Sequence, residues 1–111
     1  MPRLDFVNKE TGKCIWLDIE IREDTNGEKY YRFTIKFEDG SKAITHYIIN
    51  IGKKYQHFDC FIEGRETDYL TPHFYMSIEP DNLFTDKDML INKVTLATLN
   101  EKRKVEYDLA E

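Results

Sequence analysis

The feature that most constrains the fold is a strict alternation of apolar and polar residues in two neighbouring segments. From residue 14 to 22, and again from 30 to 38, every odd position is apolar. These positions are Ile15, Leu17, Ile19, Ile21, Tyr31, Phe33, Ile35 and Phe37. Because successive side chains of a strand point to opposite faces, a period of two predicts two β-strands that each bury one face.

The residues between these strands decide how the strands pair. A two-residue turn at Asn26-Gly27 would place Ile21 opposite Arg32, which mixes an apolar and a charged residue on one face. A three-residue loop that ends at Gly27, with this glycine as a left-handed bulge, instead pairs Ile21 with Tyr31. On the other face it forms two favourable pairs, Glu20 with Arg32 and Trp16 with Lys36. We therefore predict the three-residue loop.

Further alternating or apolar segments predict strands at residues 4–8, 42–51, 55–63, 73–79, 93–99 and 104–109. Both parities of residues 42–51 are partly apolar, as in a strand that is covered on both faces. Residues 85–88 resemble a helix capping box, which predicts one short helix near Asp86–Ile91. About eight strands with at most one helix predict a single β domain over residues 1–111, as an antiparallel sandwich or a closed barrel.

The sequence also indicates the compartment. It has no run of about 18 apolar residues and no apolar stretch near its first residue, so we expect neither a membrane span nor a signal peptide. The two cysteines, Cys14 and Cys60, are too few for a disulfide framework. We expect reduced thiols, buried as small apolar groups, in a cytoplasmic protein.

Charge is unevenly distributed along the chain. Residues 1–54 carry ten Lys or Arg and nine Asp or Glu, whereas residues 55–111 carry six and twelve, so the net charges are +1 and −6. An acidic surface repels nucleic-acid phosphates and suits a basic protein partner. The predicted interaction surface consists of Arg65, Glu66, Asp68, Tyr69, Asp81, Asp86 and Asp88.

Motifs for chemistry are absent from the sequence. It contains no glycine-rich phosphate loop, no nucleophile elbow and no calcium-binding loop, so we predict no cofactor and no metal. His57 and Asp59 share one face of a predicted strand and are the candidates for an acid–base pair. A small β-barrel enzyme would need both side chains to face a pocket, and a solvated strand face is the commoner explanation of such a pair.

These observations favour a non-catalytic binding protein that acts through a protein partner. An accessory subunit, a neutralising protein and a virus-encoded inhibitor whose carboxylates replace phosphates all fit this description. If the fold is a sandwich, an exposed edge strand could also pair two copies into a homodimer. The alternative is a module that binds carbohydrate or single-stranded nucleic acid on one sheet face, as on an oligonucleotide-binding barrel. That face would consist of Trp16, Tyr30, Arg32 and Lys36.

Overall fold

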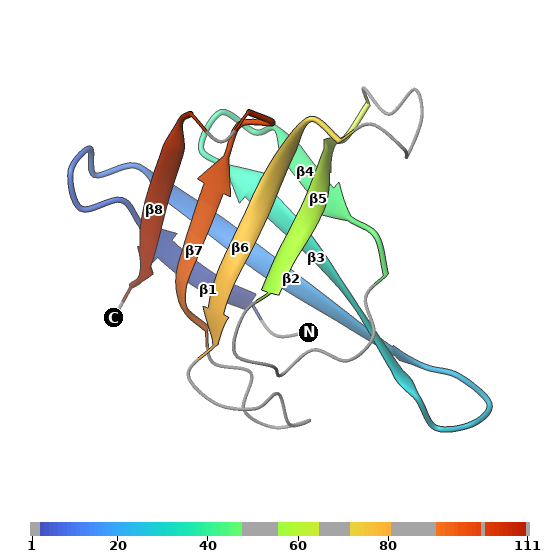
Figure 1. Cartoon of the computed structure of the whole chain (residues 1–111). Coiled ribbons are helices and arrows are strands. Elements are labelled where there is room, and N and C mark those ends of the chain that lie inside the picture. Colours follow the sequence, from blue (N-terminus) through green and yellow to red (C-terminus); the bar gives the residue numbers. More distant parts are fainter. Residues whose placement is uncertain (1–2, 48–55, 65–71, 81–90, 101, 111) are drawn as a thin grey trace.

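The computed structural model describes residues 3–47, 56–64, 72–80, 91–100 and 102–110, which form a closed barrel of eight antiparallel strands (Figure 1). The strands are β1 (Arg3–Val7), β2 (Cys14–Glu23), β3 (Lys29–Phe37), β4 (Lys42–Thr45), β5 (Gln56–Ile62), β6 (Phe74–Pro80), β7 (Ile91–Ala97) and β8 (Lys104–Leu109). Each strand pairs with the next in sequence, and β1 pairs with β8 to close the ring. The predicted all-β antiparallel fold is confirmed, and the barrel is the alternative that forms.

Two of the predictions made from the sequence are not tested by these residues. The short helix expected near Asp86–Ile91 lies outside the described ranges except for Ile91, which begins β7. Within the described ranges there is no helix long and apolar enough to cross a membrane. Homodimerisation through an edge strand was expected for a sandwich, and it stays a prediction.

The β2–β3 hairpin forms in the predicted register. Ile21 lies opposite Tyr31, and this register continues without interruption to Ile15 and Phe37 at the other end of the hairpin. Gly27 has a φ of 81°, the left-handed conformation that the three-residue loop requires. Agreement between the apolar faces is therefore enough to choose the register when a turn sequence allows two.

Asp24 stabilises the turn of this hairpin. Its carboxylate accepts hydrogen bonds from the backbone N–H groups of Glu28 and Asn26, both at 2.8 Å, and from the Tyr30 hydroxyl at 3.0 Å. These bonds, with that from Glu28 as the largest cause, hold the pKa of Asp24 below its ordinary value. Hydrogen bonds to the charged form explain this direction.

The barrel interior is filled by the inward face of the strands. Its fully buried side chains include Phe6, Leu17, Ile19, Phe33, Ile35, Met76, Ile91 and Val94. The rings of Phe33 on β3 and Phe58 on β5 lie 5.5 Å apart between their centroids, so interior packing joins strands that are not hydrogen-bonded neighbours. A small eight-stranded barrel is packed with side chains in this way.

The strand predicted at residues 42–51 is shorter than expected. Pairing ends at Thr45, whose hydroxyl accepts a hydrogen bond from the backbone N–H of Phe33 at 3.1 Å. A side-chain oxygen thus accepts this N–H group at the end of β4, and residues 46 and 47 leave the sheet. Residues 48–51 lie outside the described ranges.

Candidate functional site

The residues predicted to form the acidic interaction surface do not lie in the part of the chain that the structure describes. This applies to Arg65, Glu66, Asp68, Tyr69, Asp81, Asp86 and Asp88. The structure therefore does not test whether these residues lie together, and the acidic surface stays a prediction.

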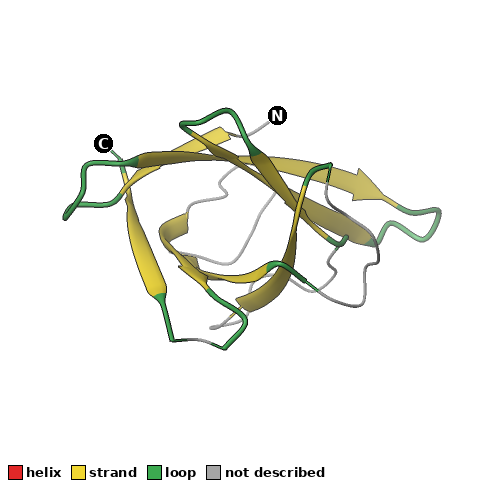
Figure 2. Cartoon of the chain, turned by 90° about the horizontal axis from the view of Figure 1, so that it is seen from above, coloured by secondary structure: helices red, strands yellow, loops and turns green. Residues whose placement is uncertain are grey.

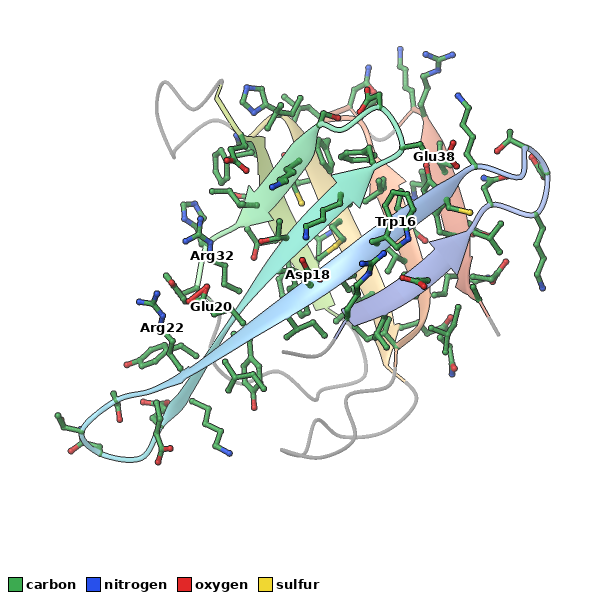
Figure 3. All side chains as sticks on the ribbon, turned by 180° about the vertical axis from the view of Figure 1, so that it is seen from behind. Trp16, Asp18, Glu20, Arg22, Arg32 and Glu38 are labelled. Atoms are coloured by element: carbon green, nitrogen blue, oxygen red, sulfur yellow. The ribbon has the colours of Figure 1, made fainter. Side chains whose placement is uncertain are left out.

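The residues of the alternative ligand face all occupy outward positions of β2 and β3. Figure 3 shows two of them, Trp16 and Arg32, on this outer face. Each is engaged within the protein. The Arg3 guanidinium lies 5.6 Å from the Trp16 ring centroid, and that of Arg32 lies 5.4 Å from the Tyr47 ring. The Lys36 ammonium forms a 2.6 Å ion pair with Asp18. A ligand on this face would have to displace internal partners.

Glu20 shows how closely this face is paired. Its carboxylate accepts hydrogen bonds from the Tyr47 hydroxyl at 3.0 Å and from Arg22 at 2.5 Å. The bond from Tyr47 is the largest cause that holds the pKa of Glu20 below its ordinary value, which keeps it charged. Tyr30 lies opposite Arg22, six positions along β2 from Trp16, or roughly 20 Å at the usual rise of a strand. The two aromatic residues therefore do not form one compact platform.

The candidate acid–base pair lies on the outer surface of β5. His57 is exposed, and its Nδ1 lies 3.2 Å from the Ser77 hydroxyl. Its ring packs beside Tyr75, 4.8 Å between centroids. Neither His57 nor Asp59 lines the pocket described next. Within the described residues, no group of three or more His, Cys, Asp or Glu is placed to hold a metal ion.

A pocket of about 630 Å³ opens at one end of the barrel, where the β1–β2 and β3–β4 turns lie. We call this end the barrel mouth; it is the upper end in Figure 1, and Figure 2 looks toward it. The apolar lining consists of Ile15, Phe37, Ile62, Phe74 and Tyr107. The polar lining consists of Lys13, Cys14, Glu38, Asp39 and Ser41. The inner face of the strands thus supplies the apolar floor, and the turns supply the polar rim.

A pair of phenylalanine rings crosses the barrel mouth. Phe37 at the end of β3 and Phe74 at the start of β6 meet edge to face, 6.4 Å between centroids. These two strands are not neighbours in the ring, so the contact spans the opening. A second hollow of about 480 Å³ shares both rings and is otherwise lined by β7, β8 and their connection. The rings therefore separate two apolar hollows at one end of the barrel.

The polar rim is held by short hydrogen bonds. The backbone N–H of Cys14 donates to the Glu38 carboxylate at 2.5 Å, which ties the start of β2 to the β3–β4 turn. Asp39 accepts hydrogen bonds from the Ser41 hydroxyl at 2.6 Å and from its backbone N–H at 2.8 Å. The bond from the Ser41 hydroxyl is the largest cause that lowers the pKa of Asp39. Two negative charges are thus fixed at the rim.

Tyr107 on β8 is the buried polar residue of the pocket. Its side chain is only 9% exposed, and no described residue forms a hydrogen bond with its hydroxyl. Within the described ranges, every fully buried side-chain oxygen has a hydrogen-bond partner. The Tyr107 hydroxyl has none, so it must be in contact with solvent. The pocket that Tyr107 lines provides this opening. Burial raises the pKa of Tyr107, and the negative charge of Glu38 adds to the effect. The pocket therefore offers an unused hydrogen-bonding group beside a carboxylate.

The two cysteines differ in a way that labelling can test. Cys14 is half-buried and lines the pocket, whereas Cys60 is fully buried and burial strongly raises its pKa. Because the thiolate is the reactive form, we expect Ellman's reagent to modify one thiol per folded chain and both in denaturant. The Cys14→Ser variant should show almost no reaction while folded. Equal reactivity of both thiols in the folded protein would contradict the burial of Cys60.

Comparison with known proteins does not assign the site. Neither models of protein families, nor characterised proteins, nor solved structures match this chain. The function must therefore be inferred from the geometry of the barrel itself.

Proposed function

We propose that this chain is a non-catalytic binding protein whose ligand is a small amphipathic molecule held at the barrel mouth. The observation that supports this most directly is the apolar pocket of about 630 Å³ with the unpartnered Tyr107 hydroxyl inside it. Small-molecule sites are typically concave and mainly apolar, about 300–1,000 Å³ in volume, with a few polar groups that orient the ligand. The barrel mouth has each of these properties.

The rest of the barrel supports this choice of site. The interior is packed below the pocket, so the barrel provides a rigid wall rather than a channel. On the outer face of β2 and β3, by contrast, Trp16, Arg32 and Lys36 already have partners within the protein. Binding at the mouth needs no internal ion pair to be broken, which favours it over the carbohydrate or nucleic-acid alternative.

The experiment is a fluorescence titration with N-phenylnaphthylamine, a neutral probe whose emission rises in apolar surroundings. We expect saturable binding of one probe per chain. Alkylation of Cys14 with a bulky maleimide should weaken it, because Cys14 is one of the residues that line the pocket. The Cys14→Ser variant, treated with the same maleimide, should keep its binding and so controls for other effects of the reagent.

A second variant separates the pocket from the sheet face. Trp16→Ala removes the aromatic group of the outer face and should leave probe binding unchanged, since Trp16 does not line the pocket. Absence of saturable binding, or binding that persists at full strength after alkylation of Cys14, would refute the proposal. Loss of binding in Trp16→Ala would instead favour the outer face as the ligand site.

A basic protein partner is a second candidate function, favoured by the net charge of −6 over residues 55–111. Carboxylate-rich surfaces steer basic partners and make their association sensitive to salt. This candidate rests on charge, whereas the ligand site rests on a pocket, and the two functions do not exclude each other.

A further inference from the structure

Building on the proposed function, we infer that the barrel mouth selects ligands that carry a protonated amine on an apolar body. The ammonium group would lie between the Glu38 carboxylate and the Tyr107 hydroxyl, and the apolar body would pack on Phe37 and Phe74. The inference depends on three features of the pocket: its charge, the unused hydroxyl and the aromatic lining.

The charged groups at the rim favour a cation. Glu38 and Asp39 line the pocket together with one ammonium, that of Lys13. Lys13 forms no ion pair with either carboxylate, and its side chain is exposed. Glu38 has the backbone N–H of Cys14 as its one hydrogen-bond partner among the described residues, which leaves one carboxylate oxygen available. A ligand cation would therefore meet a carboxylate that is positioned but not neutralised.

The hydroxyl of Tyr107 distinguishes a cation from an anion. A phenol oxygen can accept a hydrogen bond from an ammonium or donate one to a carboxylate. The Glu38 charge acts on Tyr107, so a ligand carboxylate bound there would meet a like charge. An ammonium would be attracted by Glu38 and could donate to both groups at once. Charge-assisted hydrogen bonds of this kind are the stronger class.

The aromatic lining suits the same ligand. The pocket is lined by three aromatic residues on the inward face of their strands: Phe37, Phe74 and Tyr107. Aromatic rings bury apolar surface well, and their faces also attract a nearby cation. The rings and the carboxylate together match a molecule with an apolar part and one positive charge.

The test is calorimetric titration with three matched probes that share a phenylbutyl body: phenylbutylamine, phenylbutanol and phenylbutanoate. At neutral pH the amine is protonated, the alcohol is neutral and the acid is charged negatively. We expect the amine to bind about tenfold or more tightly than the alcohol, since a charge-assisted hydrogen bond is commonly worth at least one decade in affinity. The carboxylate should bind most weakly.

Three variants assign the selectivity to named groups. Glu38→Gln should remove the advantage of the amine over the alcohol, because it keeps the shape of the side chain and removes its charge. Tyr107→Phe should weaken the amine without disturbing the apolar lining. Glu23→Gln, at the far end of β2 from the mouth, is the matched control and should bind all three probes like the unmodified protein.

The possible outcomes separate this inference from the proposed function. If the alcohol binds as tightly as the amine, or if the carboxylate binds best, the selection for amines is overturned while the pocket stands. If Glu38→Gln keeps the full preference for the amine, the assigned carboxylate is wrong and the inference fails. If none of the three probes binds, both the inference and the proposed site fail.

Discussion

Replacement of Phe33 by alanine is expected to lower the free energy of unfolding by about 3–5 kcal/mol, the usual cost of truncating a fully buried phenylalanine. Phe33 lies on the inward face of β3, is 0% exposed and packs against Phe58. Its removal would leave a cavity in the middle of a closed barrel, where neighbouring strands are bonded on both sides and cannot easily collapse. Urea denaturation followed by circular dichroism measures this loss.

Phe37→Ala is the matched control for that prediction. Phe37 belongs to the same strand and the same face, four positions further along, but it is only half-buried and lines the pocket. Truncation of Phe37 removes only part of the free energy gained by burying its ring, and it creates no new cavity. We therefore expect the free energy of unfolding to fall by about 1–2 kcal/mol. It should nevertheless abolish binding of the fluorescent probe. Equal losses of stability in the two variants would show that the mouth is packed like the core, which would remove the basis of the proposed site.

The β2–β3 hairpin could be derived from the sequence because it depends on local pattern alone. The alternation fixed the two faces, and the need to keep Ile21 and Tyr31 on the same face chose the register. Met76 and Ile78, two positions apart on β6, are buried in agreement with the same rule. A period of two is a strong signal wherever one face of a strand is buried.

Closure of the barrel could not be derived in this way. It depends on β1 meeting β8 across two residue pairs, Phe6 with Leu109 and Val7 with Asp108, which are separated by almost the whole chain. A sandwich with the same strands would show the same alternation. Long-range strand pairing therefore decides between the two folds. The alternation within each strand does not reveal this pairing.

The candidate pocket was missed for a related reason. Phe37, Phe74 and Tyr107 have the same inward parity as core residues, so the sequence predicts that they are core. Their difference lies in position along the barrel, since Phe37 ends β3 and Phe74 begins β6. An aromatic residue next to a turn, as Phe37 is next to Glu38 and Asp39, is the one signal that could have indicated a lining residue.

Phe61 on β5 is buried although its position in the alternating pattern predicts an exposed side chain. It has outward parity with His57 and Asp59 on β5, yet it is 0% exposed and is not part of the barrel core. The rings of His46 and His73 pack on it, with centroids 4.8 Å and 6.4 Å away. Residues outside the sheet can thus bury an outward side chain, and strand parity alone does not reveal this.

Asn8 connects the closure of the barrel to its mouth, and Asn8→Ala is expected to cost about 2–4 kcal/mol in the free energy of unfolding. This side chain is only 8% exposed. Its amide nitrogen donates to the backbone carbonyl of Glu106 on β8 at 3.0 Å, and its oxygen accepts from the backbone N–H groups of Glu10 and Thr11, both at 2.9 Å. Alanine would leave these groups without their partner.

The Asn8→Asp variant separates the contribution of the β1–β2 turn to stability from that of the contact with β8. Aspartate keeps the oxygen that accepts hydrogen bonds from the β1–β2 turn, but it replaces the donor to the Glu106 carbonyl with a second acceptor. A large loss of unfolding free energy in this variant would therefore assign the stability to the contact with β8. Urea denaturation measures both variants, and a loss below about 0.5 kcal/mol in Asn8→Ala would contradict the assignment, because that is the range of neutral surface changes. The same turn carries Lys13 and Cys14 to the rim. Loosening it should therefore also weaken probe binding at the mouth, since the pocket wall depends on the contact that helps close the barrel.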